Sequence, residues 1–272
     1  MLSDITLGQF FPAKSLMHKA DPRLKICLTI FSIVLIFAAG NFFSLGWAVL
    51  YIALAMALSK IPLKMYLRAL KPILFLVAFT AVLNIFYGTG DPLFQWGILK
   101  ITKNGLLNCL FVSIRIIVLI LASSVLTFTT SPTQLTDAIE RLLRPLSKLH
   151  VPVHDFAMMM TIALRFVPLL MEETDKIMSA QKARGADMES GGLVQRVKAL
   201  IPVLIPLFVS AFRRAYDLAT AMESRCYHGG EGRTKMKVLR FSSHDYCIIG
   251  SALLALAAFI TLNMVFPSAI VR

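Results

Sequence analysis

Two histidines are the residues most easily taken for metal ligands, but their spacing does not suit a shared site. His150 and His154 stand four residues apart, the interval that places two side chains on one helix face. Pro152 lies between them and interrupts such a helix. We therefore expect no metal site in this chain.

The acidic cluster of Glu172, Glu173 and Asp175 has the residue types, but not the pattern, of a membrane metalloprotease. Those enzymes commonly place an arginine four residues after a Glu-Glu pair, and Ile177 stands at that position. Glu172 and Lys176 instead have the spacing of an ion pair on a solvated helix face. The sequence also lacks paired Asp-x-x-x-Asp motifs and a Gly-x-x-x-x-Gly-Lys-Ser/Thr phosphate loop. We expect neither enzymatic activity nor a cofactor bound by this chain.

Arg115 is the single charged residue in the apolar run 106–128. A charge at membrane depth is costly and often marks a functional site. The alternative is structural: the guanidinium reaches the interface or caps backbone carbonyls inside a helix bundle. We favour the structural interpretation and keep Arg115 as a candidate intramembrane polar site.

Two arginines stand at the predicted C-terminal ends of two long helices. The first lies in Ala183-Arg184-Gly185 and the second in Ser224-Arg225-Cys226. The helix dipole alone favours a cation at each place. A guanidinium also offers five donors in a planar fork, which suits carboxylates or carbonyls in a groove of another protein. The repeat of this ending favours a second hypothesis, in which both arginines contact partners.

Three alanines recur at four-residue intervals near the second of these endings. Ala211, Ala215 and Ala219 therefore form one small-residue stripe on a predicted helix. Small side chains let a second helix approach closely. We expect this stripe to mark the crossing of two long helices.

The composition excludes an ordinary soluble enzyme. Of 272 residues, 57% are hydrophobic and only 16% are charged, and the mean hydropathy is +0.72. Typical soluble domains carry about 25% charged residues. The net charge of +13 lies largely beside apolar runs, as the positive-inside rule predicts, so we expect no nucleic-acid partner. The four cysteines have no metal-binding spacing.

Five apolar runs predict five transmembrane helices, at residues 26–39, 42–58, 72–87, 106–128 and 246–266. The loop 60–71 carries four cations and no acid, which places it in the cytosol: Lys60, Lys64, Arg68 and Lys71. A turn is expected at residues 88–92 and an outward-facing segment up to Lys103. The N-terminus lacks a signal peptide, so we expect it in the cytosol.

Residues 130–240 differ in charge from the rest of the chain, with 16 of the 28 Lys and Arg residues and 11 of the 15 Asp and Glu residues. The pattern predicts helices over 133–149, 153–184 and from Gly192 to about Arg225, with apolar stretches too short to span a membrane. We therefore predict an all-α polytopic membrane protein: a membrane domain (1–129), a cytosolic helical coupling domain of long crossing helices (130–240) and a final transmembrane helix (241–272). Five spans and a cytosolic N-terminus leave the C-terminus outside.

The chain resembles the transmembrane (T) component of energy-coupling factor transporters, which are ABC-type importers of vitamins and metal ions. The resemblance rests on the strings TTSPTQLTDAIERLLRPLSKLHVPVHDFAMMMTIALRFVPLLMEETDKIMSAQKARGAD and IPVLIPLFVSAFRRAYDLATAMESRCY, and on Asp21-Pro22-Arg23 near the N-terminus. It covers nearly the whole chain and is strongest over residues 129–228.

The resemblance implies a membrane subunit that lies beside a small substrate-binding S component and rests on two cytosolic ATPases. In that family two short Ala-Arg-Gly-like motifs contact grooves on the ATPases. Ala183-Arg184-Gly185 matches this motif fully. Ser224-Arg225-Cys226 keeps the arginine but changes both flanks, so we expect its helix to continue for about a turn toward Gly229.

The implied function is a non-enzymatic coupling subunit in the cell membrane, with ATP and magnesium bound by the partner ATPases. ATP-driven closure of the ATPases is transmitted through the arginine-tipped helices to the S component during vitamin or micronutrient uptake. One alternative is the substrate-translocating subunit of a conventional ABC transporter, in which Arg115 lines a polar cavity. The other alternative is an intramembrane enzyme.

Overall fold

The computed structural model describes residues 10–86, 92–96, 99–186, 192–229 and 241–266. The chain forms two compact units. We call Gly8–Ala138 together with Val238–Arg272 the bundle unit, and Ile139–Lys237 the long-helix unit. The predicted all-α class is confirmed, and the strands among the described residues are one short antiparallel pair, β1 (Pro92–Trp96) and β2 (Leu99–Thr102).

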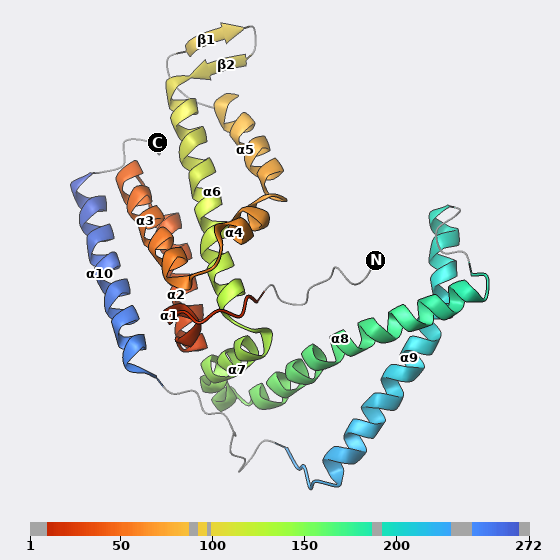
Figure 1. Ribbon diagram of the computed structural model, residues 1–272. Coiled ribbons are helices and arrows are strands. Elements are labelled where there is room, and N and C mark those ends of the chain that lie inside the picture. Colours follow the sequence, from red (N-terminus) through yellow and green to blue (C-terminus); the bar gives the residue numbers. More distant parts are fainter. Residues whose placement is uncertain (1–9, 87–91, 97–98, 187–191, 230–240, 267–272) are drawn as a thin grey trace. The chain divides into compact units, whose positions relative to one another are not determined.

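The bundle unit contains the helices α1 (Leu16–Lys19), α2 (Pro22–Ala38), α3 (Phe42–Ser59), α4 (Leu63–Leu70), α5 (Leu74–Phe86), α6 (Lys103–Thr129) and α10 (Ser243–Val265). In this unit α2, α3, α4 and α5 pack against α6, and α10 packs against α3 and α2 (Figure 1). The core of the unit is apolar and includes Leu35, Ile36, Leu45, Ile52, Phe111, Val118 and Phe259. Large apolar side chains such as Phe37, Phe75 and Leu254 also face outward, as expected where lipid replaces water.

Five described helices are long and apolar enough to cross a membrane: α3, α6, α10, α8 (Val153–Ala183) and the part of α9 from Val197 to Glu223. The first three coincide with predicted runs. α2 has 17 residues, or about 26 Å of helix, so it needs flanking residues to span about 30 Å of hydrocarbon. The apolar stretches that we expected to be too short instead run on within α8 and α9. By length and composition alone, α8 and α9 therefore cannot be distinguished from transmembrane helices. Their position outside the bilayer stays a prediction.

The third predicted run is α5, and the loop before it contains the short helix α4. The two helices are bent by 59° at the break between them. Pro72 lies in that break and has no backbone N–H with which to continue the helical hydrogen-bond pattern. The turn predicted at residues 88–92 lies outside the described residues except for Pro92, which begins β1.

The long-helix unit contains α8 and α9 (Leu193–Glu223), which contact each other. The predictions of helices from residue 153 to 184 and from 192 to about 225 are confirmed to within two residues. Pro168 lies at the middle of α8, and Pro202 and Pro206 lie within α9. Each long helix continues through its prolines.

The helix predicted over residues 133–149 is wrong in its second half. α7 (Pro132–Leu143) ends early, and Arg144–Leu149 is a 3-10 helix. Pro145 explains the change, because its ring clashes with the carbonyl of the preceding turn and it cannot donate the next helical hydrogen bond.

A buried carboxylate joins the starts of α2 and α10 in the bundle unit. Asp245 is 1% exposed, and its Oδ1 accepts a 3.0 Å hydrogen bond from the backbone N–H of Asp21. Its Oδ2 accepts from the backbone N–H of Ser242 at 2.7 Å, which caps α10. Asp21 in turn caps α2 through the N–H of Arg23 at 2.9 Å. One side chain thus fixes the starts of both helices.

We predict that Asp245→Ala destabilises the chain by about 2–4 kcal/mol, because the buried N–H of Asp21 and the N–H of Ser242 both lose a charged acceptor. Asp245→Asn keeps one acceptor oxygen and should cost less. The measurement is the thermal unfolding midpoint of the purified chain in detergent. Asp217→Ala, at an exposed position on α9, is the control. Equal midpoints for wild type and Asp245→Ala would contradict the role of this carboxylate.

Candidate functional site

The first candidate arginine stands at a tightly closed helix end. α8 ends at Ala183, Arg184 follows as the cap, and Gly185 takes a left-handed φ of 85°. The N–H of Ala186 donates to the carbonyl of Gln181, and the N–H of Gly185 donates to that of Lys182, both at 3.0 Å. These two bonds define a Schellman motif, which satisfies carbonyls that the helix end leaves free.

The second ending repeats this hydrogen-bond pattern without a glycine. The N–H of Tyr227 donates to the carbonyl of Met222 at 3.1 Å, and the N–H of Cys226 donates to that of Glu223 at 2.8 Å. Cys226 has a left-handed φ of 53° and occupies the place of Gly185. The expected extension of this helix toward Gly229 is therefore wrong. Two closing hydrogen bonds offset the cost of about 1 kcal/mol or more that a side chain adds to this conformation.

Arg184 and Arg225 thus take the same position in two equivalent helix ends. Both side chains are exposed, as are Ala183, Gly185, Ser224 and Cys226. Neither guanidinium is hydrogen-bonded to another described residue. Each lies at the negative end of a helix dipole and presents its planar fork of donors outward.

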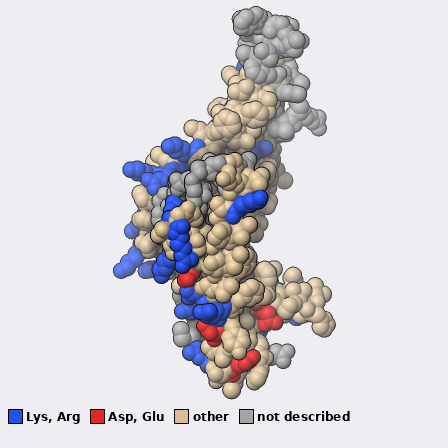
Figure 2. All heavy atoms as spheres, turned by 90° about the vertical axis from the view of Figure 1, so that its right-hand side faces the viewer, with Lys and Arg blue, Asp and Glu red and all other residues tan. Residues whose placement is uncertain are grey.

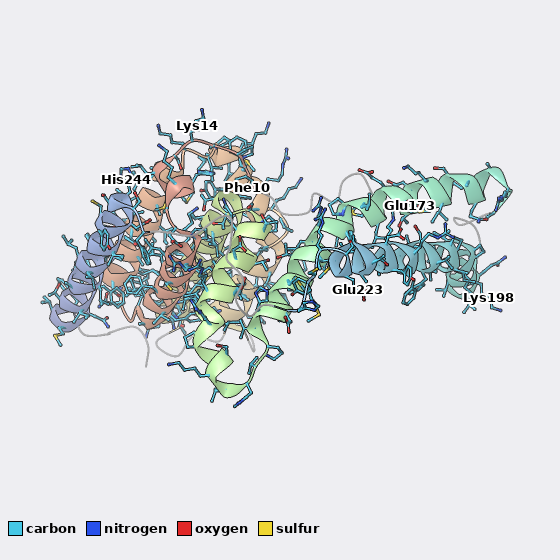
Figure 3. All side chains as sticks on the ribbon, turned by 90° about the horizontal axis from the view of Figure 1, so that it is seen from below. Phe10, Lys14, Glu173, Lys198, Glu223 and His244 are labelled. Atoms are coloured by element: carbon cyan, nitrogen blue, oxygen red, sulfur yellow. The ribbon has the colours of Figure 1, made fainter. Side chains whose placement is uncertain are left out.

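Glu173, one member of the acidic cluster, forms an ion pair between α8 and α9. Arg214 of α9 donates to Oε2 of Glu173 of α8 at 2.7 Å, and both side chains are about one third exposed or less. Figure 3 shows Glu173 between the two helices. His154, one of the two histidines weighed as metal ligands, contacts Oε1 of Glu140 through Nδ1 at 3.2 Å. Both groups therefore have partners within the long-helix unit.

The three alanines of the predicted crossing stripe differ in burial. Ala211 is half-buried, whereas Ala215 and Ala219 are exposed. The face of α9 that carries Arg214, and with it the contact to α8, is marked by reduced exposure of Val203, Leu207, Ala211, Leu218 and Met222. Ala215 and Ala219 lie instead beside exposed Phe208, Phe212 and Tyr216. A crossing through these two alanines stays a prediction.

Arg115 makes the contacts expected of a structural residue that caps a backbone carbonyl. Its guanidinium donates a short hydrogen bond to the carbonyl of Ala39, the residue that follows α2. It also lies 4.6 Å from the centre of the Phe111 ring, within the range of a cation–π contact. The free carbonyl at the end of α2 is thus satisfied from α6.

Asp245 is the residue of clearest structural consequence that the sequence analysis missed. Its capping box with Ser242 is readable from local spacing, because an acid three residues after a serine is a helix-start signal. Its bond to Asp21 joins residues 224 positions apart, and no local pattern reports such a contact.

We predict opposite responses at the two left-handed positions. Gly185→Ala should raise amide exchange in the last turn of α8 about fivefold, because an added Cβ strains a φ of 85° although the space around it is open. Cys226→Gly should slow exchange in the last turn of α9. The measurement is hydrogen exchange by mass spectrometry on the purified chain. Gly46→Ala, also in open space, is the control. Equal responses at Gly185 and Gly46 would count against the closed ending.

We predict that Arg115→Met lowers the unfolding midpoint by a few degrees, because the Ala39 carbonyl loses its donor at a cost of about 1–3 kcal/mol. Arg115→Lys keeps a donor and should be milder. The exposed Arg165→Met is the control. Loss of transport with an unchanged midpoint would assign Arg115 a functional role instead.

Comparisons with known proteins identify the family. A family model described as CbiQ, cobalt transport protein, matches residues 13–236. The energy-coupling factor transporter transmembrane protein EcfT of Ruminiclostridium cellulolyticum is 51% identical over 98% of this chain and 100% of that protein. Its counterpart in Clostridium kluyveri is 52% identical over 90% of this chain and 92% of that protein. The EcfT protein of Bacillus subtilis is 45% identical over 95% of this chain and 97% of that protein.

These matches extend over both units and include both arginine-capped helix ends. They agree with the apolar helices and with the resemblance found in the sequence. The chain therefore belongs to the CbiQ family, as a transmembrane component of an energy-coupling factor transporter.

Proposed function

We propose that this chain is the coupling subunit of its importer and transmits ATP-driven motion from two cytosolic ATPases to an S component. The observation that carries the proposal is the pair of equivalent helix ends at Arg184 and Arg225. Each offers an exposed guanidinium on a closed, hydrogen-bonded tip. A pair of ATPases presents two grooves, and two like tips suit two like sites.

The docking chemistry follows from the guanidinium. Its planar fork can donate in parallel to a carboxylate or to backbone carbonyls of an ATPase groove, which an ammonium group cannot do with the same geometry. Ala183 and Ser224 precede the arginines with small side chains, so each tip can enter a narrow groove. ATP and magnesium belong to the ATPases, and this chain supplies no catalytic group.

We place the long-helix unit and the N-terminus on the cytosolic side. The support is charge: residues 130–240 hold 27 of the 43 charged residues, and the exposed loop cations before α5 follow the positive-inside rule. This arrangement leaves the C-terminus outside the cell.

We propose that the exposed apolar face of α9 contacts the S component. α9 exposes Phe208, Phe212 and Tyr216 beside the small Ala215 and Ala219. The 13 Met and 19 Phe residues of the chain suit a surface that accepts several shapes. A vitamin or other micronutrient would then be bound by the S component.

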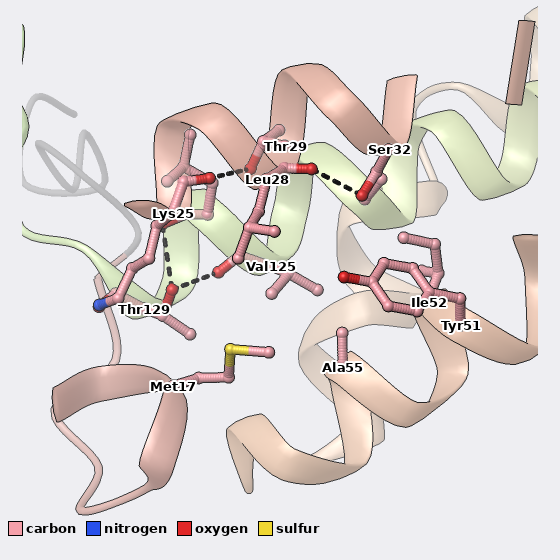
Figure 4. Close-up of a pocket in the computed structure, with 12 residues that line it drawn as sticks. Met17, Lys25, Leu28, Thr29, Ser32, Tyr51, Ile52, Ala55, Val125 and Thr129 are labelled. Carbon is pink, nitrogen blue, oxygen red and sulfur yellow. Dashed lines mark hydrogen bonds between the residues drawn. The ribbon is translucent and has the colours of Figure 1, made fainter. Parts of the chain in front are cut away.

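The alternative of a conventional substrate-translocating subunit calls for a polar cavity among the spans. The pocket between α2, α3 and α6 encloses about 40 Å³, room for only a few water molecules (Figure 4). Its hydroxyls of Thr29 and Ser32 donate to carbonyls of their own helix. A second pocket of about 190 Å³ is also lined mainly by apolar residues. Arg115 lines neither, and Lys25, the cation that lines the first, donates to the carbonyl of Thr129 at 3.0 Å, so these two cavities favour coupling.

We predict that Arg184→Glu combined with Arg225→Glu abolishes co-purification of the ATPases and uptake of the substrate, because acids replace donors at both contacts. The measurement is a pull-down of the tagged chain from native membranes with mass spectrometry, together with cellular uptake. Arg184→Lys with Arg225→Lys keeps the charge but loses the fork, and should give partial loss.

Arg165→Glu combined with Arg213→Glu is the matched control, because both residues are exposed on the same two helices away from the tips. This control should retain the ATPases. Normal uptake in the tip variant would overturn the proposal. Equal loss in the control would attribute the effect to net charge and not to the tips.

A further inference from the structure

The short helix α4 is fixed to the bundle unit by one of its faces. Tyr66 is 1% exposed, and its hydroxyl lies 3.0 Å from Oγ of Ser59 at the end of α3. Its ring packs edge-on against Phe128 of α6 at 5.4 Å between centroids. Ile61, just before the helix, is also buried in this cluster. The orientation of α4 is therefore determined by packing.

The opposite face of α4 combines exposed leucines with cations. Leu63 and Leu67 are 64% and 59% exposed and stand four apart, so they form one ridge. Lys64 and Arg68 form the adjacent ridge, which Lys60 and Lys71 extend beyond the helix ends, and all four cations are exposed. The leucine ridge and the cation ridge run side by side along the helix.

These cations have no acid nearby in the sequence. The chain contains no Asp or Glu between Asp21 and Asp91. Like charges four apart on a helix repel each other by a few tenths of a kcal/mol. On the face drawn in Figure 2, basic side chains likewise outnumber acidic ones. An external anion is the natural partner for such a ridge.

The bend after α4 indicates which anion this is. α5 is an apolar helix that continues from α4 after a turn of 59°, so α4 cannot run parallel to it across the hydrocarbon. A helix at that junction lies where acyl chains meet headgroups. Exposed leucines beside lysines and arginines match that boundary, because apolar side chains enter the acyl region while cations reach the phosphates.

We propose that α4, with Lys60 and Lys71, forms a binding surface for the headgroups of anionic phospholipids. The leucine ridge embeds in the acyl boundary and the cation ridge contacts lipid phosphates. The surface holds the bend between α4 and α5 at the membrane interface. This inference does not depend on the coupling function, and an acidic protein surface is the competing partner.

The test uses the full chain reconstituted in phosphatidylcholine vesicles with spin-labelled phosphatidylglycerol or phosphatidylcholine. Electron paramagnetic resonance gives the ratio of the two association constants. We expect wild type to prefer phosphatidylglycerol, and Lys64→Gln, Arg68→Gln, Lys71→Gln to lower that preference at least about fivefold, since each cation near an anionic surface contributes about that factor before screening. Lys60 is left unchanged because its backbone is left-handed.

Two controls separate charge from position. Lys64→Arg, Arg68→Lys, Lys71→Arg retains the charges and should retain the preference. Arg144→Gln, Lys148→Gln, Lys176→Gln removes three exposed cations from the long-helix unit and should also retain it. An unchanged preference in the α4 variant, or equal loss in this second control, would overturn the proposal. Loss of a co-purifying protein with an unchanged lipid preference would assign the surface to a protein partner.

Discussion

A chain this apolar has to satisfy the polar groups at its helix ends from within, because lipid offers them no hydrogen bonds. The carboxylate of Asp245 meets this constraint at the starts of α2 and α10 together. Arg115 meets it at the end of α2, and Asn41 caps α3 through the N–H of Ser44. These three polar side chains of the bundle unit therefore act at helix ends. Its apolar surfaces stay free to contact lipid or partner subunits.

The two helix ends of the long-helix unit that are proposed to meet the ATPases are also satisfied from within the chain. Each helix end closes on itself by two backbone hydrogen bonds, so the arginine beside it has no capping bond to make in the turn. The side chain is left for contact with another molecule. A structural requirement, the satisfied helix end, thus presents the functional group. Glycine at one end and cysteine at the other reach the same geometry by different means.

Much of the architecture could be predicted because long apolar runs and helix-breaking residues are local signals. The spans α3, α6 and α10 and the extents of α8 and α9 followed from such patterns. The break at Pro145 was readable but was missed, and the left-handed Cys226 was not readable, because glycine is the usual signal for that conformation. The bond between Asp21 and Asp245 depends on three-dimensional packing. The positions of Arg184 and Arg225 were predicted, while the equivalence of their helix ends needed the backbone.

The middle of α8 has a mechanical consequence. Pro168 removes one backbone hydrogen bond near the centre of a helix about 46 Å long. The closed C-terminal end resists fraying, whereas the centre is the point of lowest bending stiffness. A bend of about 10° at that point moves the C-terminal tip by about 4 Å. Under the proposed coupling function, a sideways load on the tip would therefore be taken up as bending at Pro168.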